Sequence, residues 1–148
     1  MTVSPSSTHV FVREATHADA PEVVRLIRNS VDKGSPISEG YVHEYMNHPN
    51  SKILLAGKDG KSVGLLSYST RPDLWHAKIC CFIEEITVEE SERGKGIGTQ
   101  LIQSVMNKMK KSGCAEIVLT VDKKNIAAQR LYKRLGIDEE LLCLEKHL

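Results

Sequence analysis

Long apolar runs are missing from this 148-residue chain. No stretch approaches the roughly 18 consecutive apolar residues that a membrane-spanning helix needs. Residues 1–8 are polar and contain Pro5, so they lack the apolar region of a signal peptide. We therefore expect residues 1–8 to be a disordered N-terminal tail, and we expect a cytoplasmic protein with no membrane partner.

A strong charge of one sign is also absent. The formal net charge is +1 at pH 7, which gives no general electrostatic attraction to nucleic acids or anionic membranes. No signature of a DNA-binding or RNA-binding fold appears in the sequence. We therefore expect no nucleic-acid partner.

Metal-ligand spacing is lacking among the cysteines and histidines. No two cysteines have C-x-x-C spacing, and His43 and His48 are five residues apart, which misses the i, i+4 spacing of a helical metal pair. We predict no metal, and we expect the four cysteines to be reduced core thiols: Cys80, Cys81, Cys114 and Cys143. His76 is a candidate to line a substrate pocket.

The composition is that of one small enzyme domain. With 41% hydrophobic and 26% charged residues, the chain can build one core but is too short for two ordinary domains. We expect a single domain over residues 9–148.

Hydrophobic periodicity predicts a mixed order of strands and helices. Asp19 and Glu22 form a capping-box pattern at the start of a first helix, whose apolar face is Val23, Val24, Leu26, Ile27 and Val31. Asp59-Gly60 is a strong hairpin signal. The predicted strands are residues 9–14, 53–56, 62–69, 79–88, 115–121 and 141–145, and further helices are predicted near residues 38–46, 97–111 and 125–136. This order indicates an α/β (α+β) domain with right-handed crossovers in its parallel part.

The segment Arg-Gly-Lys-Gly-Ile-Gly at residues 93–98 lies where an apolar strand ends and an amphipathic helix begins. Gly94, Gly96 and Gly98 have no Cβ, so a ligand can approach the backbone while the first amides of the helix point at it. Arg93 and Lys95 add positive charge. The segment therefore predicts a site for an anionic ligand such as a pyrophosphate.

Two nucleotide-binding patterns fit this segment poorly. The dinucleotide fingerprint requires a third glycine where this chain has Leu101, and the Walker pattern requires Ser or Thr after the lysine, where this chain has Gly96. A nucleotide- or RNA-binding module stays as an alternative that predicts affinity for ATP, NAD or RNA. A tight turn without a ligand is the other alternative.

A second motif follows at residues 125–136, with the pattern N-x-x-A-x-x-L-Y-x-x-x-G. Together with the R-x-x-G-x-G segment at residues 93–98, it resembles the acetyl-CoA site of the GNAT superfamily of acetyl-CoA-dependent N-acetyltransferases. The resemblance extends along nearly the whole chain. It implies a single-domain GNAT-like fold, with a central mixed twisted sheet of six to seven strands flanked by about four helices.

The resemblance also implies where acetyl-CoA, the co-substrate, would bind. Backbone N–H groups of residues 86–88 would donate to the thioester oxygen and the pantetheine, and Asn125 would contact the coenzyme arm. The implied coenzyme-binding residues are Ile86, Thr87, Val88, Arg93, Gly94, Lys95, Gly96, Ile97, Gly98, Thr99, Asn125, Ala128 and Leu131.

Three side chains are candidates for proton transfer. An amine attacks a thioester only when neutral, and a lysine-like amine has a pKa of about 10.4, so a base is needed at pH 7. Glu84 and Glu85 interrupt an apolar strand, where carboxylates are costly unless they are paired or functional. Alternation favours Glu84, because it would share a face with Ile86 and Val88, whereas a one-residue bulge would exchange the two. Solvated or ion-paired carboxylates at a sheet edge are the alternative.

Tyr132 is the remaining candidate. In the family, the tyrosine of the L-Y pair protonates the leaving thiolate. Read without the resemblance, Tyr132 is a half-buried aromatic residue with its hydroxyl at the surface.

The resulting prediction is an N-acetyltransferase that moves the acetyl group of acetyl-CoA to a primary amine of a small cationic metabolite by direct attack. Residues 31–50 and 71–78 would face this acceptor. Acetylation of a protein N-terminus or lysine, and a non-catalytic CoA-binding module, are the alternatives. Dimers are common in the family, so the resemblance also allows a homodimer.

Overall fold

The computed structural model describes residues 9–30 and 34–148. The predicted tail at residues 1–8 and the predicted place of Val31 in the first helix lie outside these ranges. Within them the order along the chain is β1 (Phe11–Glu14), η1 (His17–Asp19), α1 (Ala20–Arg28), α2 (Glu39–Asn47), β2 (Ser51–Lys58), β3 (Lys61–Asp73), β4 (Lys78–Val88), η2 (Glu90–Glu92), α3 (Ile97–Lys111), β5 (Ile117–Leu119) and α4 (Ile126–Arg134).

The strands form one mixed sheet in the order β1-β2-β3-β4-β5. The pairs β1–β2, β2–β3 and β3–β4 are antiparallel, and the pair β4–β5 is parallel. The turn between β2 and β3 holds Asp59 and Gly60 at φ values of 52° and 76°, which is the left-handed conformation that an Asp-Gly hairpin requires. The parallel pair needs a crossover connection, and α3 lies in it.

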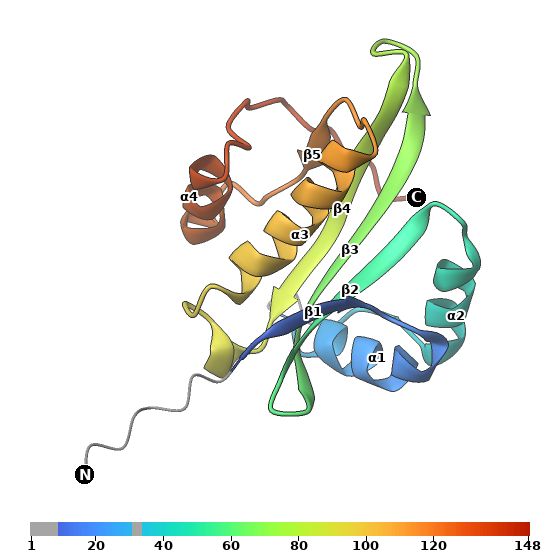
Figure 1. The fold of residues 1–148 in the computed structure, drawn as a ribbon, viewed down its shortest axis with the longest axis vertical. Helices are drawn as coiled ribbons and strands as arrows, with labels where there is room; N and C mark the ends of the chain where they lie inside the picture. Colours follow the sequence, from blue (N-terminus) through green and yellow to red (C-terminus); the bar gives the residue numbers. More distant parts are fainter. Residues whose placement is uncertain (1–8, 31–33) are drawn as a thin grey trace.

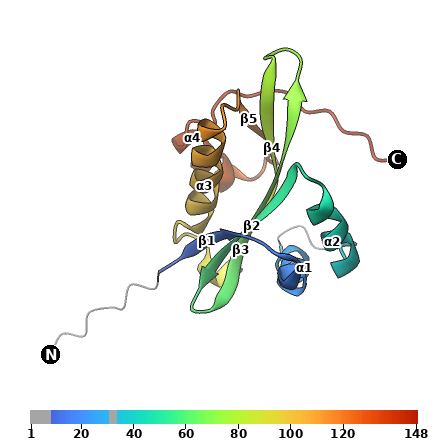
Figure 2. The same cartoon turned by 45° about the vertical axis from the view of Figure 1, so that its right-hand side comes forward.

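Helices cover both faces of the sheet (Figure 1). After a turn of 45°, α1 and α2 lie on one side of the strands, and α3 and α4 lie on the other (Figure 2). None of the helices in residues 9–30 and 34–148 has the length and apolar character that a membrane span needs.

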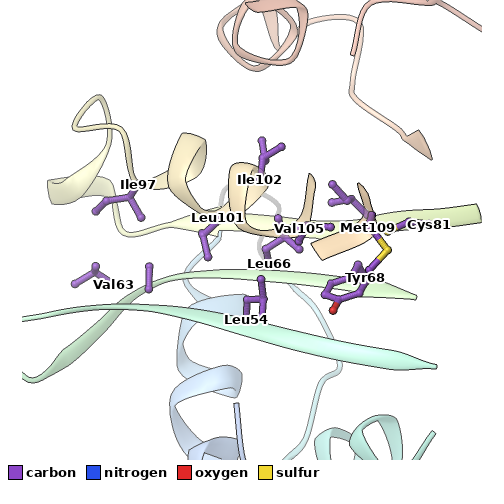
Figure 3. Packing of buried hydrophobic residues seen from close by; sticks show 12 residues of the cluster. Leu54, Val63, Leu66, Tyr68, Cys81, Ile97, Leu101, Ile102, Val105 and Met109 are labelled. Carbon is purple, nitrogen blue, oxygen red and sulfur yellow. The ribbon is translucent and has the colours of Figure 1, made fainter. Parts of the chain in front are cut away.

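Strand alternation divides the core into two clusters. Leu66 of β3 packs with Leu101 and Val105 of α3 (Figure 3), whereas the preceding residue, Leu65, packs with α1 and α2 on the opposite face. Successive strand side chains point to opposite faces, so β3 contributes apolar side chains to both clusters. The sheet is therefore buried on both sides along β2 and β3.

The first helix begins where the sequence predicts, but its predicted capping box is wrong. Asp19 is the N-cap of α1 and makes no capping bond to that helix. Its carboxylate instead accepts from the Thr16 backbone N–H at 2.8 Å and from both terminal nitrogens of Arg13 at 2.7 and 2.8 Å. The Asp19 carboxylate therefore binds Arg13 of β1 instead of the backbone amides of α1.

The predicted strand at residues 141–145 is also wrong. Leu141, Leu142 and Leu144 are 77–85% exposed, and residues 135–148 form no strand. The apolar run resembles a strand, but β5 has only three residues, so its edge offers few backbone groups for a sixth strand. The sheet of the described residues thus has five strands rather than six to seven.

Candidate active site

A bulge in β4 lies at the centre of the site. Pairing with β3 joins Ile83 to Tyr68 and Glu85 to Ser67, so Glu84 is an extra residue without a place in the ladder. On its other side, β4 pairs with β5 only up to Ile83. The edge of β4 is therefore open from residue 84 to residue 88, which includes the predicted backbone donors Ile86, Thr87 and Val88.

The glycine-rich segment forms the turn between η2 and α3. Gly94 and Gly96 have φ values of 75° and 83°, which other residues adopt only with strain. Gly96 is the N-cap of α3 and has no side chain to cap it. The first backbone bond of the helix runs from Gln100 N–H to the Gly96 carbonyl, so the amides of Ile97, Gly98 and Thr99 precede the intrahelical ladder. This geometry fits a phosphate group.

The two basic residues of the turn are held differently. Arg93 donates from Nε to the Val88 carbonyl at 3.1 Å, which ties the turn to the end of β4 and leaves the outer guanidinium nitrogens for a ligand. Lys95 Nζ lies 3.3 Å from Glu92, and Glu92 also pairs with Lys58 at 2.9 Å. Sequence reasoning missed Glu92, whose charge offsets part of the positive charge of this turn.

Helix α4 packs beside the start of α3. A Cβ at Gly98 would lie 3.5 Å from Leu131 Cδ2, an ordinary van der Waals distance, so the two helices are in contact at this point. Asn125 caps α4, because its Oδ1 accepts from the Ala128 N–H at 3.1 Å. The Nδ2 amide group and the second lone pair of Oδ1 are thus left for the predicted contact of Asn125 with the coenzyme arm.

Tyr132 projects from α4 to the edge of the main core cluster. Burial raises the pKa of its hydroxyl, and the charge of Glu85 raises it further. Both effects disfavour the phenolate. At neutral pH Tyr132 is therefore a phenol that can donate a proton.

Glu84 lies on the opposite side of the sheet from the prediction. Ile86 and Val88 pack toward α3, whereas the Glu84 carboxylate accepts from Tyr45 Oη of α2 at 2.7 Å and from Ser69 Oγ at 2.8 Å. The expected alternation fails because the bulge inserts one residue. The two hydroxyl groups fix the carboxylate and leave further lone pairs on its oxygens.

Burial and the Glu84 charge act on Tyr45 as well. Burial is the larger cause, and together with the hydrogen bond to Glu84 it raises the pKa of Tyr45 above its ordinary value. Tyr45 therefore remains a donor to Glu84 at neutral pH.

A groove lies between α1, α2 and the sheet, beside Glu84. Its volume is about 140 Å³, and its walls are apolar except near Tyr45 and Ser67: Val23, Ile27, Ile37, Tyr41, Val42, Tyr45, Ile53, Leu65 and Ser67. The groove includes part of residues 34–50, where an acceptor was predicted. Residues 71–78, the other predicted acceptor segment, do not line this groove. Trp75 is 90% exposed at the β3–β4 hairpin, and His76 pairs with Asp73.

The buried cysteines do not have the character of nucleophiles. Burial raises the pKa of the Cys81 thiol to about 12, and burial together with nearby acidic groups raises the pKa of Cys80. A nucleophilic cysteine needs an accessible thiolate. This agrees with the prediction of direct attack without an acyl-enzyme.

Comparison with known proteins places these features in a family. The Acetyltransferase (GNAT) family matches residues 20–137, so the chain belongs to the GNAT family of acetyltransferases. The aminoalkylphosphonate N-acetyltransferase of Salmonella typhimurium is 30% identical and aligns with 93% of this chain and 90% of its own length. The N-alpha-acetyltransferase 30 of Schizosaccharomyces pombe is 40% identical, over 82% of this chain and 79% of its own.

Other relatives are longer than this chain. The L-2,4-diaminobutyric acid acetyltransferase of Nocardia farcinica is 26% identical over 82% of the chain, which spans 61% of that protein. Among solved structures, a transcriptional regulator from Bacillus halodurans has a TM-score of 0.84 at 29% identity, with 95% of this chain and 100% of that one covered. The structure of an aminoglycoside N-acetyltransferase, AAC(6')-Iy, in complex with CoA has a TM-score of 0.83 at 21% identity. The match covers 98% of this chain and 99% of that one, and it shows that the two chains share a fold.

Proposed function

We propose that this protein is an acetyl-CoA-dependent N-acetyltransferase that acts on the primary amine of a small cationic metabolite. The observation that carries the proposal is the open edge of β4 between a glycine-capped helix and Tyr132. This arrangement offers backbone amides to phosphates at one end and a phenol to a leaving thiolate at the other. The family membership of the chain supports the same assignment.

The two carboxylates take separate roles in this proposal. The bulge places Glu84 next to Tyr45, which lines the groove, and Glu84 accepts the proton of the substrate ammonium, either directly or through a water molecule. Burial raises the pKa of Tyr132, and the charge of Glu85 raises it further. Environments that separate an acid from a base in this way are the usual basis of acid–base pairs in active sites.

The reaction then proceeds by direct displacement. The neutral amine forms the new C–N bond at the thioester carbonyl, while a backbone N–H of β4 donates to the carbonyl oxygen. As the C–S bond breaks, Tyr132 donates its proton to the leaving sulfur. As the amide forms, its nitrogen loses a second proton to water. The chain gains a proton at Glu84 and loses one at Tyr132, and exchange with solvent restores both residues.

The size and the lining of the groove favour a small acceptor. Its volume of about 140 Å³ is below the roughly 300–1,000 Å³ of pockets that enclose drug-sized ligands. Apolar walls suit a short aliphatic chain, and the negative charge of Glu84 suits its ammonium group. Relatives named for diaminobutyric acid, aminoalkylphosphonate and thialysine acetylation support an acceptor of this kind.

Acetylation of a protein N-terminus is the second candidate, because the N-alpha-acetyltransferase 30 of S. pombe is 40% identical to this chain. An assay of CoA thiol release with different acceptors would distinguish the two candidate functions. L-2,4-Diaminobutyrate, aminoethylphosphonate and thialysine would be compared with peptides that have free N-termini. A higher kcat/KM for small amines supports the first proposal, and turnover confined to the peptides overturns it in favour of the second.

A further inference from the structure

A cluster of metal-ligating side chains lies at the β3–β4 hairpin, apart from the acetyl-transfer site. Asp73 ends β3, His76 lies in the turn, and Cys80 is near the start of β4. Their ligand atoms all lie within 4.8 Å of one another, and within residues 9–30 and 34–148 no other group of three such side chains meets this condition.

The three ligand atoms converge on one side of the His76 ring. Nδ1 of His76 lies 2.8 Å from Asp73 Oδ2 and 3.8 Å from Cys80 Sγ. Zinc bonds of about 2.0–2.3 Å at tetrahedral angles separate nitrogen from sulfur by about 3.6 Å and nitrogen from oxygen by about 3.4 Å. Cys80 and His76 already have nearly this separation, whereas the Asp73 oxygen lies about 0.6 Å closer to Nδ1 than zinc binding requires.

The other nitrogen of His76 lies near a carboxylate. His76 Nε2 lies 3.8 Å from Glu116 Oε2, next to β5. Histidines that bind a metal through one nitrogen commonly donate from the other to a carboxylate, which fixes the ring and strengthens the ligand. This arrangement differs from a catalytic triad, because Asp73 and Cys80 both approach Nδ1 rather than opposite nitrogens.

The surrounding charges favour a cation. Burial raises the pKa of the Cys80 thiol, and the negative charges of Asp73 and Glu116 raise it further. Hydrogen bonds from His76 lower the pKa of Asp73, and the charge of Arg71 adds a smaller effect. Arg71 also stacks on the Phe82 ring at 4.1 Å. Cys80 is 1% exposed, whereas the His76 and Asp73 side chains are 36% and 26% exposed. A metal can thus enter from the solvent side and keep a water molecule as fourth ligand.

We propose that Asp73, His76 and Cys80 form a zinc site that braces the β3–β4 hairpin. Sulfur, nitrogen and oxygen ligands together suit Zn²⁺ better than Mg²⁺ or Ca²⁺. Binding replaces the thiol proton of Cys80 with the metal, so one proton is released to solvent. The site lies four residues along β4 from Glu84, about 13 Å at roughly 3.3 Å per residue, so its role is structural. This proposal departs from the prediction of no metal.

The test is a titration of the reduced, chelator-treated protein with Co²⁺ at pH 7.5, followed by displacement with Zn²⁺. We expect one ion per chain and the near-ultraviolet absorption of a cobalt–thiolate bond. His76→Ala and Cys80→Ser should each weaken Zn²⁺ binding by roughly 100-fold, and Glu116→Gln by about 10-fold. Circular dichroism would verify that each variant is folded.

Cys143→Ser and His48→Ala serve as matched controls, since both replace the same residue types away from the hairpin, and they should bind as the parent protein does. A spectrum without a thiolate band, or unchanged affinity in the folded His76→Ala variant, would overturn the proposal. Because His76 is exposed, this variant remains informative even if replacement of the buried Cys80 disrupts folding. Acetyl-CoA binding should be the same in all variants, so this outcome is independent of the transferase assignment.

Discussion

Burial and a neighbouring charge act in the same direction on the Tyr132 phenol. Both raise its pKa, so the proton is retained at pH 7 and is available to a leaving thiolate. Tyr132→Phe should lower kcat by about 100-fold or more, in line with the roughly 10²–10⁴ contributed by general acid–base groups. Acetyl-CoA affinity should change little. Steady-state kinetics and calorimetry would measure the two quantities.

Lys133→Gln is the matched control for Tyr132, because it replaces the next residue of the same helix, at an exposed position. It should have nearly normal turnover. Normal turnover in Tyr132→Phe would instead remove Tyr132 from the acid role.

The two glutamates of the bulge can be distinguished by pH. Glu84→Gln should lower kcat/KM at neutral pH, with partial recovery as the pH rises, because the substrate amine then loses its proton without a base. Glu85→Gln removes the charge that raises the pKa of Tyr132. Since tyrosine has an ordinary pKa of about 10, Tyr132 stays protonated at pH 7, and the loss at neutral pH should be small.

Profiles of kcat/KM from pH 6 to 10 for the two variants would check this division of roles. A Glu84→Gln profile that is lowered equally at every pH would contradict the assignment of Glu84 as the base. A larger loss in Glu85→Gln would exchange the two roles.

At the scale of elements, the distance between α3 and the sheet depends on a glycine in β3. A Cβ at Gly64 would lie 3.0 Å from Ile97 Cγ2 and 3.3 Å from Leu101 Cδ1, both in α3. Gly64→Ala should therefore push the helix outward and reduce the free energy of unfolding by about 1–3 kcal/mol, as overpacking does. Urea denaturation would measure the change.

Gly57→Ala is the matched control for this change. It lies in β2, and the nearest atoms to an added Cβ are 3.9 Å away, so it should unfold close to the parent midpoint. Equal midpoints for the two variants would mean that α3 does not depend on close contact at Gly64.

The stability that the Arg13–Asp19 ion pair contributes should depend on pH. This ion pair connects β1 to the start of α1. Arg13 is the largest cause that holds the pKa of Asp19 well below its ordinary value. A lowered folded-state pKa stabilises the fold above the unfolded value of about 3.9, and that stabilisation is lost as the pH falls toward the folded value. Arg13 is half exposed, so Asp19→Asn should cost only about 1 kcal/mol at pH 7.

Urea denaturation at pH 7 and pH 3 would test this linkage. The difference between Asp19→Asn and the parent protein should shrink at pH 3, while Asp138→Asn, in an exposed segment, should match the parent at both. A difference that is the same at both values would contradict an ionic origin.

At the scale of the whole molecule, the sequence predicted those features that depend on neighbouring residues. The Asp59-Gly60 turn, the glycine-capped helix at residue 97 and the helix after Asn125 are all encoded locally. The bulge at Glu84 was not predictable, because the register of β4 depends on β3. The strand at residues 141–145 was wrong because an apolar run does not specify a partner edge, and the cluster at Asp73 was missed because its spacing matches no common ligand motif.

We expect acetyl-CoA to bind along the open edge of β4 and at the glycine-rich turn. Calorimetric titration with acetyl-CoA, with ATP and NAD as comparison ligands, would test this. Gly96→Ala should bind about tenfold more weakly, because a left-handed alanine costs about 1–2 kcal/mol and the turn can relieve that strain by leaving the conformation that binds the phosphates. Gly113→Ala, at the other end of α3 with a similar φ of 74°, should bind normally. Micromolar acetyl-CoA binding with no response to ATP or NAD is the predicted result, and no acetyl-CoA binding by the parent protein would contradict the account.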